Sequence, residues 1–523
     1  MRKAPLSFLA ICVLIIAALL TAGCTTGQPA SPAASGDALL VQADLAYRNA
    51  NYMTAAQLYN DSYTQYTAAG NTSAARDALN HAFTAYRMII EFPLNRTDAE
   101  SAVRAAFPDA SADQVNAWLS ARDTARITSD GRELFFYDTV ANIRYHDPAL
   151  MRMMTAASGK SPFYDEVKDL ALDPPVAGRD PLFDEVKNLT LAPPVTAGGP
   201  YRSPVTFEIT QQLSLPVDSL PKTGVLRLWV PAPINSGSQT NVTVISIEPV
   251  QYVKFMPDTR ADIGLAYMEV PLSNLTGEYL NLTTRYGFIQ HEQRFVIDPA
   301  KVRAYNTSDP EYLKYTASGK NIVITPEMKQ KAQEIVGNET NPYLQARMIY
   351  WYIVNTLPYS HAPHIYLDAA GIPESTYVLD TGIGDCGSQS MYFAALCRSL
   401  GIPARAVGGY QLVPGLEGTH FWAEYYLVGY GWVPVDVTIA EGGDWAYNAT
   451  PDQVHRWKEY YFGSLDPYRY IIQNDVDIPI VPDPGNAVMF HMVVQSPKIA
   501  CDTCNEDVDL LLTNNWTTVV KRG

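Results

Sequence analysis

The chain has 523 residues, of which 47% are hydrophobic, so several globular domains are expected rather than one core. Its formal net charge of −16 argues against nucleic acid and against an anionic lipid surface as electrostatic partners. A solvated acidic surface is the simplest interpretation of this charge.

The N-terminus has the pattern of an export signal. Arg2 and Lys3 precede an apolar run from Leu6 to Leu20, and small residues followed by Cys24 end that run. We therefore predict a lipoprotein-type signal peptide over residues 1–24, with lipid attached to Cys24. An uncleaved membrane anchor and plain secretion are the alternatives, and all three place the chain outside the cytoplasm.

Residues 25–36 are rich in Thr, Ser, Pro, Ala and Gly, which predicts a flexible tether between a membrane and the body of the protein. Residues 37–158 are predicted to form a helical domain. Apolar residues recur there at three- and four-residue spacing up to Phe92, with a break at Gly70. This pattern resembles tetratricopeptide helical hairpins, and a small antiparallel bundle is the alternative. We expect a strand-like patch from Glu133 to Tyr145 to end the domain.

Residues 159–200 contain an internal repeat, because Asp-Glu-Val-Lys occurs at residues 165–168 and again at 184–187. Proline and glycine are dense here, so we predict a semi-rigid linker, with a docking motif as the alternative. From residue 201 to 300 the hydrophobic period changes to two, as in Val225 to Val230. This change predicts a β-sandwich.

Residues 301–475 form the predicted catalytic domain, which begins with helices over Pro326 to Val336 and Pro342 to Thr356. Cys386 lies where a further helix begins, and Gly401 ends that helix. A thiol at a helix N-terminus feels the positive end of the helix dipole, so we expect a lowered thiol pKa.

Two histidines, His361 and His364, precede this helix as a His-x-x-His pair. Nothing nearby completes a set of metal ligands, so we interpret them as exposed or substrate-edge residues. The segment from Tyr366 to Gly384 is predicted to be a loop bordering the active cleft. The aromatic residues between Trp445 and Tyr470 are interpreted as core packing, with a sugar- or peptide-binding wall as the alternative.

Downstream, His420 lies in an aromatic-rich strand, and a turn at residues 429–431 leads into a second strand that carries Asp436. An imidazole beside a thiol accepts its proton, and a carboxylate on the other ring nitrogen fixes the tautomer and stabilises the imidazolium. The hairpin brings His420 and Asp436 toward one end, although simple pairing leaves them a few residues out of register. Cys386, His420 and Asp436 are therefore a candidate catalytic triad. The N–H group of Cys386 is a candidate oxyanion donor.

Residues 476–523 form a predicted C-terminal extension with a strand over Val488 to Val494. Two of the chain's 6 cysteines, Cys501 and Cys504, form a Cys-x-x-Cys motif there. Outside the cell this motif favours a local disulfide, because the tail does not offer the partners that a metal site needs. No metal and no cofactor is expected. Plentiful Asn-x-Ser/Thr glycosylation sequons agree with export.

The motifs around the three candidate residues resemble those of the transglutaminase-like superfamily. In chain order the matching segments are Gly384-x-Cys386, then Cys397-Arg398-Ser399-Leu400-Gly401-Ile402-Pro403-Ala404-Arg405, then His420-Phe421-Trp422-x-Glu424, then Gly431-Trp432-Val433-Pro434-Val435-Asp436. Val437 departs from the family, which usually has proline after the aspartate. The resemblance covers Tyr343 to Glu441. It implies a papain-like α+β core with the cysteine on a helix and the other two residues on antiparallel strands.

This resemblance implies a cysteine enzyme within an α+β multidomain chain. Cys386 would attack an amide carbonyl to form a thioester, with His420 as base and then acid and Asp436 orienting the ring. Hydrolysis by a peptidase or amidase is favoured over cross-linking, because a site open to water defaults to hydrolysis. The expected partners are a protein or peptide substrate in the cell envelope and the membrane at the N-terminus. The second hypothesis is a catalytically inactive, membrane-anchored scaffold or binding protein, because much of the chain lies outside the catalytic region.

Overall fold

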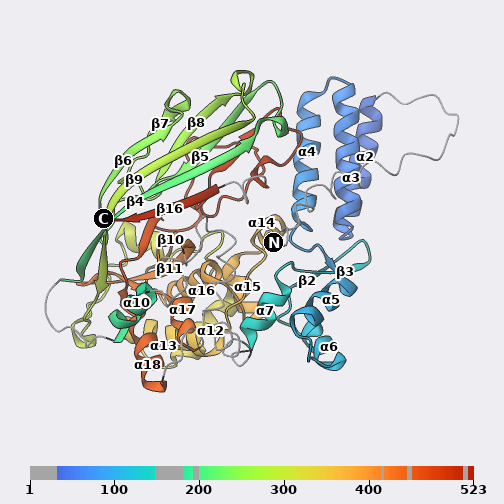
Figure 1. Cartoon of the computed structure of the whole chain (residues 1–523). Helices are drawn as coiled ribbons and strands as arrows, with labels where there is room; N and C mark the ends of the chain where they lie inside the picture. Colours follow the sequence, from blue (N-terminus) through green and yellow to red (C-terminus); the bar gives the residue numbers. More distant parts are fainter. Residues whose placement is uncertain are drawn as a thin grey trace.

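The computed structural model describes residues 32–147, 150, 181–191, 199–413, 417–444, 450–510 and 516–523. The predicted signal peptide with Cys24 and the first copy of the internal repeat lie outside these residues. Within the described ranges, no helix has both the length and the apolar character that crossing a membrane requires. The chain is a multidomain α+β protein, as predicted, with N-terminal helices beside a body that contains several sheets (Figure 1).

Three consecutive helices form the first layer of the N-terminal unit. They are α2 (Pro32–Arg48), α3 (Tyr52–Ala68) and α4 (Thr72–Arg87). Buried alanines such as Ala43, Ala55 and Ala85 lie between them and allow close packing. Gly70 has a φ of +72° in the turn before α4, which is the break that the sequence predicts. Helix α2 begins inside the segment predicted as a tether, and the tetratricopeptide resemblance stays a prediction.

A second, smaller layer completes the N-terminal unit. Its elements are β1 (Leu94–Asn95), α5 (Arg96–Ala106), α6 (Ala112–Ser120), β2 (Arg126–Ser129), β3 (Arg132–Phe135) and α7 (Thr139–His146). The strand-like patch predicted to reach Tyr145 is therefore wrong beyond Phe135. Its β-branched and aromatic residues favour a strand, but Ile143 packs from a helix into the core around Val103 and Phe135. Helix α10 (Pro181–Leu191) carries the second copy of the internal repeat.

The middle of the chain forms the predicted β-sandwich. One sheet contains β4 (Tyr201–Pro216), β6 (Gln239–Glu248), β9 (Tyr279–Arg294), β13 (Ser464–Leu465) and β16 (Trp516–Arg522). The other contains β5 (Val225–Pro231), β7 (Val253–Phe255), β8 (Leu265–Pro271) and β15 (Lys498–Cys501). Alternate residues of both sheets, such as Leu213, Leu228 and Met268, share one core. The two sheets therefore pack face to face.

The C-terminal segment returns to this sandwich. No strand forms over Val488 to Val494, which corrects the prediction, and β15 and β16 pair with β5 and β4 instead. The apolar residues of the predicted strand are buried in irregular backbone. The N–H group of Val494, for example, donates to the side chain of Gln473 rather than to a neighbouring strand.

The catalytic region is an antiparallel sheet with helices packed against it. The sheet has the strand order β12 (Gly431–Val435), β11 (Gly418–Leu427), β10 (Ala404–Gln411) and β14 (Arg469–Gln473). The helices of this region are α11 (Pro310–Thr316), α12 (Pro326–Val336), α13 (Pro342–Thr356), α14 (His364–Ala370), α15 (Glu374–Thr381), α16 (Cys386–Ser399), α17 (Val437–Glu441) and α18 (Pro451–Tyr460). Every residue of α16 from Gly387 to Arg398 is buried, so this helix lies at the centre of the region.

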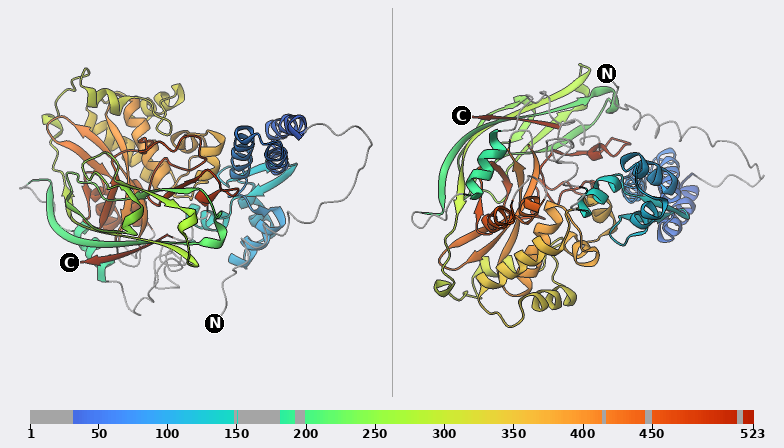
Figure 2. Two further views of the ribbon diagram at one scale, coloured as in Figure 1. Left: turned by 90° about the horizontal axis from the view of Figure 1, so that it is seen from above. Right: turned by 60° about the horizontal axis from the view of Figure 1, so that its bottom comes forward.

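The segment from Tyr366 to Gly384, predicted as a loop, is mostly helical. Helices α14 and α15 occupy it, and each ends at a glycine in the left-handed conformation. These glycines are Gly371 and Gly382, with φ values of +66° and +78°. Both views in Figure 2 show the N-terminal helices at one side of the main body, and α14 contacts α4 across that boundary.

The aromatic residues near the end of the catalytic region are buried. Trp457, Tyr460, Tyr461, Tyr468 and Tyr470 all belong to the largest hydrophobic core. Their interpretation as core packing is therefore confirmed, and they form no exposed binding wall. Trp445 lies outside the described residues.

Candidate functional site

Helix α16 begins at Cys386, as predicted, because Asp385 caps it. The Oδ1 atom of Asp385 accepts hydrogen bonds from the N–H groups of Gly387 and Ser388, both at 3.0 Å. The Ser388 hydroxyl accepts from the N–H group of Asp385 at 2.9 Å, which completes a capping box. Cys386 is the first residue inside the helix and is partly exposed, whereas Cys397 is buried in the core. The capping geometry therefore holds the thiol at the helix N-terminus.

His420 and Asp436 are joined by a hydrogen bond. The Nε2 atom of His420 lies 2.8 Å from Oδ2 of Asp436, and both residues are buried. Ala423 pairs with Val435, so Asp436 falls opposite Trp422, two residues from His420. Diagonal neighbours two residues apart share one face of a sheet, which explains how the gap in register is closed. Asp436 follows the last residue of β12 and caps α17, so it lies just beyond the predicted strand.

Arg469 is a third member of this polar chain that the sequence did not indicate. Its Nη1 atom lies 2.5 Å from Oδ2 of Asp436, and its Nη2 atom lies 2.8 Å from Oδ2 of Asp466. Arg469 is 2% exposed and its guanidinium lies 5.2 Å from the centre of the Trp422 ring. Although burial raises the pKa of Asp436, the charges of His420 and Arg469 outweigh it and hold that pKa well below its usual range.

The thiol of Cys386 lies beside the strand that carries His420. The backbone N–H groups of Phe421, which follows His420, and of Gly387 both donate toward the sulfur. Phe421 also contacts Gly387, since a Cβ atom built on that glycine would lie 3.4 Å from the ring. These contacts bring the start of α16 and the middle of β11 together.

The pKa of the Cys386 thiol is raised, not lowered as the helix dipole alone would predict. Burial is the largest cause, and the negative charges of Asp385 and Asp436 add to it, against the hydrogen bonds from Phe421 and Gly387. A thiolate at this position therefore needs a cation next to it. In the described part of the chain the N–H group of Cys386 has no hydrogen-bond acceptor, so it is free to bind an oxyanion.

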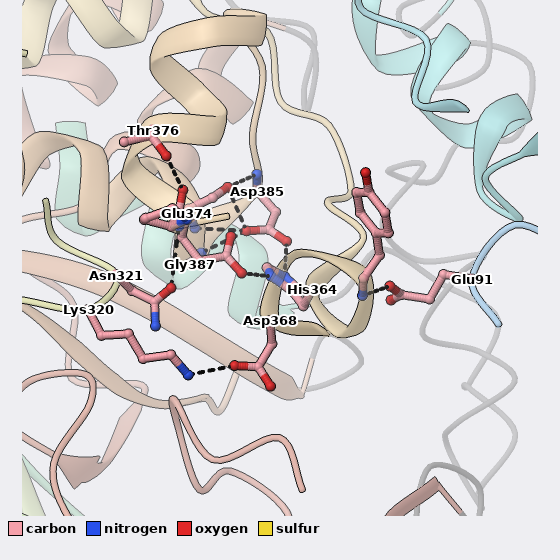
Figure 3. A network of polar contacts seen from close by, with 12 residues as sticks. Glu91, Lys320, Asn321, His364, Asp368, Glu374, Thr376, Asp385 and Gly387 are labelled. Carbon is pink, nitrogen blue, oxygen red and sulfur yellow. Dashed lines mark hydrogen bonds and ion pairs between the residues drawn. The ribbon is translucent and has the colours of Figure 1, made fainter. Parts of the chain in front are cut away.

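His364 is not a freely exposed histidine, as one of its two interpretations had it, and its place at the substrate edge stays a prediction. Its Nδ1 atom lies 2.7 Å from Oε1 of Glu374, and its Nε2 atom lies 2.6 Å from Oδ2 of Asp385 (Figure 3). His361 likewise has a partner, since its Nδ1 atom lies 2.9 Å from Oδ2 of Asp138. Among the described residues, no group of three or more His, Cys, Asp and Glu side chains has the arrangement of a metal site. The ion pairs could not be found from the sequence because Glu374 lies in a segment predicted as a loop.

The Cys-x-x-Cys motif is a disulfide in the structure, with Cys501 and Cys504 joined and their Cα atoms 5.3 Å apart. This loop contacts the N-terminal unit, because Arg76 on α4 donates to the backbone carbonyls of Asp502 and Cys504. The motif therefore lies at the junction between the sandwich and the N-terminal helices.

Residues 329–437 match the family model of the transglutaminase-like superfamily, and this segment contains Cys386, His420 and Asp436. An uncharacterized protein of Haemophilus influenzae is 32% identical over 162 residues, which amount to 26% of this chain and 42% of that protein. This chain therefore spans less than half the length of that relative.

Two solved structures match this chain at low identity and with TM-scores below 0.5. A candidate cysteine protease from Cytophaga hutchinsonii is 14% identical with a TM-score of 0.36, over 62% of this chain and 89% of that protein. The periplasmic domain of TgpA from Pseudomonas aeruginosa is 16% identical with a TM-score of 0.22, over 51% of this chain and 100% of that domain. The assignment of a transglutaminase-like core rests on the family match, which supports a cysteine enzyme of the hydrolase or transferase class.

Proposed function

We propose that this chain, whose residues 329–437 carry a transglutaminase-like core, is an exported cysteine enzyme that cleaves or transfers an amide acyl group. The observation that carries the proposal is the hydrogen bond between His420 and Asp436, on the strand whose next residue, Phe421, directs its backbone N–H group at the sulfur of Cys386. Because Nε2 of His420 is bonded to Asp436, its Nδ1 atom is the nitrogen left to act on the thiol.

The reaction proceeds in two halves. In the first, the Cys386 thiol gives its proton to Nδ1 of His420 and the sulfur attacks the amide carbonyl carbon. The backbone N–H group of Cys386 donates to the developing oxyanion. The C–N bond then breaks, the amine leaves with the proton from the imidazolium, and a thioester on Cys386 remains. Asp436 stabilises the imidazolium and Arg469 holds Asp436 in place.

In the second half, His420 removes a proton from water, and the resulting nucleophile attacks the thioester. The C–S bond breaks, the carboxylic acid leaves, and the thiolate takes the proton back. An amine in place of water would give transamidation by the same steps. We favour hydrolysis by a peptidase or amidase, because Cys386 is partly exposed and a site open to water defaults to hydrolysis.

The predicted export signal with Cys24 supports a location at the cell surface, where the substrate would be a protein or peptide of the envelope. A catalytically inactive scaffold is the second candidate. The large non-catalytic share of the chain favours it, since the sandwich and the N-terminal helices offer wide surfaces.

Alkylation of the full chain with iodoacetamide tests the enzyme proposal. Cys386 is expected to react faster than free glutathione near neutral pH, and His420→Ala is expected to slow it to the rate of an ordinary buried thiol. Mass spectrometry assigns the modified residue, and Cys386→Ala is the control for reaction at Cys397. A wild-type Cys386 that reacts no faster than glutathione and does not respond to His420→Ala would favour the scaffold.

A further inference from the structure

His364 connects two buried carboxylates at the start of the helix that carries the thiol. Glu374 is 1% exposed and Asp385 is 8% exposed, and each carboxylate accepts a hydrogen bond from one ring nitrogen of His364. Figure 3 shows the ring between them, with Gly387 of α16 on the far side of Asp385. Neither Glu374 nor His364 has a part in the reaction steps above.

The two bonds define the charge on His364. Burial raises the pKa of Glu374, and the charge of His364 opposes that effect. With both carboxylates ionised, each ring nitrogen must carry a hydrogen to donate, so the two bonds then require the imidazolium. Burial lowers the pKa of His364, but the charges of Asp385 and Glu374 raise it well above its usual value. Burial raises the pKa of Asp385 as well, but the charge and the hydrogen bond of His364 outweigh burial and hold that pKa below its usual range.

Asp385 has two different roles through its two oxygens. Oδ1 caps α16 and Oδ2 accepts from His364, so one side chain joins the cation to the helix start. Its negative charge is also the largest charge effect that opposes the thiolate of Cys386. A positive His364 in contact with that carboxylate weakens the repulsion between Asp385 and a thiolate at Cys386.

The N-terminal unit holds the segment on both sides of His364. The N–H group of Tyr366 donates to Oε2 of Glu91 at 2.8 Å. The side chain of Asn142 makes two hydrogen bonds to the backbone of His361, at 2.8 and 3.0 Å, and Asp138 bonds its ring. Residues of the N-terminal unit therefore fix the backbone three residues before and two residues after His364.

We propose that His364 is a positioning residue of the active site, which orients and neutralises Asp385 beside Cys386 and is itself placed by the N-terminal helical unit. The inference rests on the proposed function, because it assigns a task to His364 only if Cys386 reacts as a thiolate. It gives the N-terminal unit a role in the chemistry without any contact with the thiol.

Other titratable groups face this cluster from the neighbouring elements, and Tyr377 on α15 is one that interacts with both Glu374 and Asp385. Glu91 faces it from the segment after α4, and burial raises the pKa of that carboxyl to about 7. Tyr137 and Asp138 approach from the start of α7, and Asp368 on α14 is paired with Lys320 at 2.7 Å. The alkylation rate of each variant therefore has to be measured over the same pH range as that of the wild type, so that titration of these groups affects both profiles alike.

The test is the rate of Cys386 alkylation by iodoacetamide as a function of pH, measured on the full chain. His364→Gln keeps a side-chain donor but removes the charge. It is expected to move the midpoint of the profile up by about one pH unit and to lower the rate at pH 7 about tenfold. Asp385→Asn keeps the helix cap, because asparagine caps as well as aspartate, and it removes the negative charge. It is expected to move the midpoint down.

A double variant and two controls complete the design. Once Asp385 is neutral, His364→Gln should have a much smaller effect, so the two changes are non-additive. Asn142→Ala should shift the midpoint in the same direction as His364→Gln but less. His455→Gln removes a histidine on α18 whose ring stacks on Trp351 with the ring centres 5.5 Å apart. This variant should leave the profile unchanged. Thermal unfolding confirms that each variant is folded.

Opposite shifts for His364→Gln and Asp385→Asn support the inference, because a loss of structure would shift both the same way. Shifts of one sign, or an unchanged midpoint in His364→Gln, would overturn it. A wild-type Cys386 that reacts more slowly than glutathione at every pH contradicts the proposed function instead. The two failures are therefore distinguishable.

Discussion

Arg469 is the residue through which strand β14 takes part in the candidate site. It is buried and bonded to Asp436 and Asp466, so its charge is shared between two buried carboxylates. Removing one partner of a buried charge network leaves the others without compensation, and this costs more than the network contributes when intact. Arg469 therefore supports both the stability of the core and the orientation of His420.

We expect Arg469→Gln to lower the free energy of unfolding by about 3–5 kcal/mol, as for other broken buried ion pairs. Urea denaturation at pH 7 measures this loss. The exposed Arg456→Gln on α18 is the matched control and should change stability by less than about 0.5 kcal/mol. Equal effects of the two variants would show that the Asp436–Arg469 contact contributes nothing to stability.

The pH dependence of stability provides a separate prediction at the same residue. The pKa of Asp436 is depressed in the folded state by His420 and Arg469 against the effect of burial, so its contribution is present at neutral pH. That contribution is lost as pH falls below the ordinary carboxyl range toward the folded pKa. In Arg469→Gln one of the depressing charges is gone, so the acid unfolding midpoint should move to higher pH. Acid titration followed by circular dichroism checks the direction.

The sequence predicted the three candidate residues but not Arg469. Cys386, His420 and Asp436 lie in motifs of a helix start and one hairpin, which are local patterns. Arg469 reaches Asp436 only because β14 pairs with β10, and β10 pairs with β11. Such pairing depends on contacts between segments far apart in the chain, which a single sequence does not reveal.

Strand β10 is the element that positions β11 and hence His420. Gly409 on β10 is the register partner of His420, and on its other side it approaches the backbone of β14. A Cβ atom on Gly409 would lie 1.9 Å from the carbonyl oxygen of Tyr470, so only glycine permits this approach. The position of the histidine therefore depends on a residue with no side chain.

We expect Gly409→Ala to destabilise the protein by about 1–3 kcal/mol, because backbone atoms must move to admit the methyl group. It should also reduce the alkylation rate of Cys386 in the fraction that remains folded, since the register partner of Gly409 is His420. Gly418→Ala, on β11 of the same sheet, meets nothing within 4 Å and is the control. Similar losses in both variants would contradict the steric account.

The longer helices around the candidate site were predictable from the sequence, and the shorter ones were not. Helices α12 and α13 have the predicted bounds, because each has an N-cap, a proline at its start and a long apolar face. Helices α14 and α15 have only seven and eight residues, too few for a periodic pattern, although Gly371 and Gly382 mark their ends. The ion pairs of His364 were missed with them.

At the scale of the whole molecule, the C-terminal segment joins the N-terminal helices to the β-sandwich. Arg87 on α4 is 2% exposed and bonds Asp507 at 2.7 and 2.9 Å and Asp509 at 3.2 Å. The loop closed by Cys501 and Cys504 accepts further hydrogen bonds from Arg76. Because the unit that these contacts fix also carries Glu91 and Asn142, they bear on the placement of His364.

We expect Arg87→Met to loosen this junction and to leave the sandwich and the catalytic sheet folded. The variant removes the cation that bonds both aspartates and links α4 to the C-terminal segment, so the N-terminal unit should separate before the rest unfolds. Limited proteolysis should then cut between the N-terminal unit and residue 201 sooner than in the wild type. Arg48→Met is the control, because this arginine at the end of α2 is exposed and its guanidinium donates to the backbone carbonyl of Asp44 on the same helix. A cleavage rate equal to that of the wild type would contradict the role given to Arg87.

The pairing of β16 with β4 has a consequence for how the protein is made. Residues 516–522 lie along residues 207–213 over seven consecutive register positions, so the first strand of the sandwich receives its neighbour from more than three hundred residues further along the chain. During synthesis that edge stays open until the late residues have emerged, and closing so long a loop is slow. The sandwich therefore cannot be completed before the last residues of the chain are available, and until then one edge of β4 stays open to unwanted pairing.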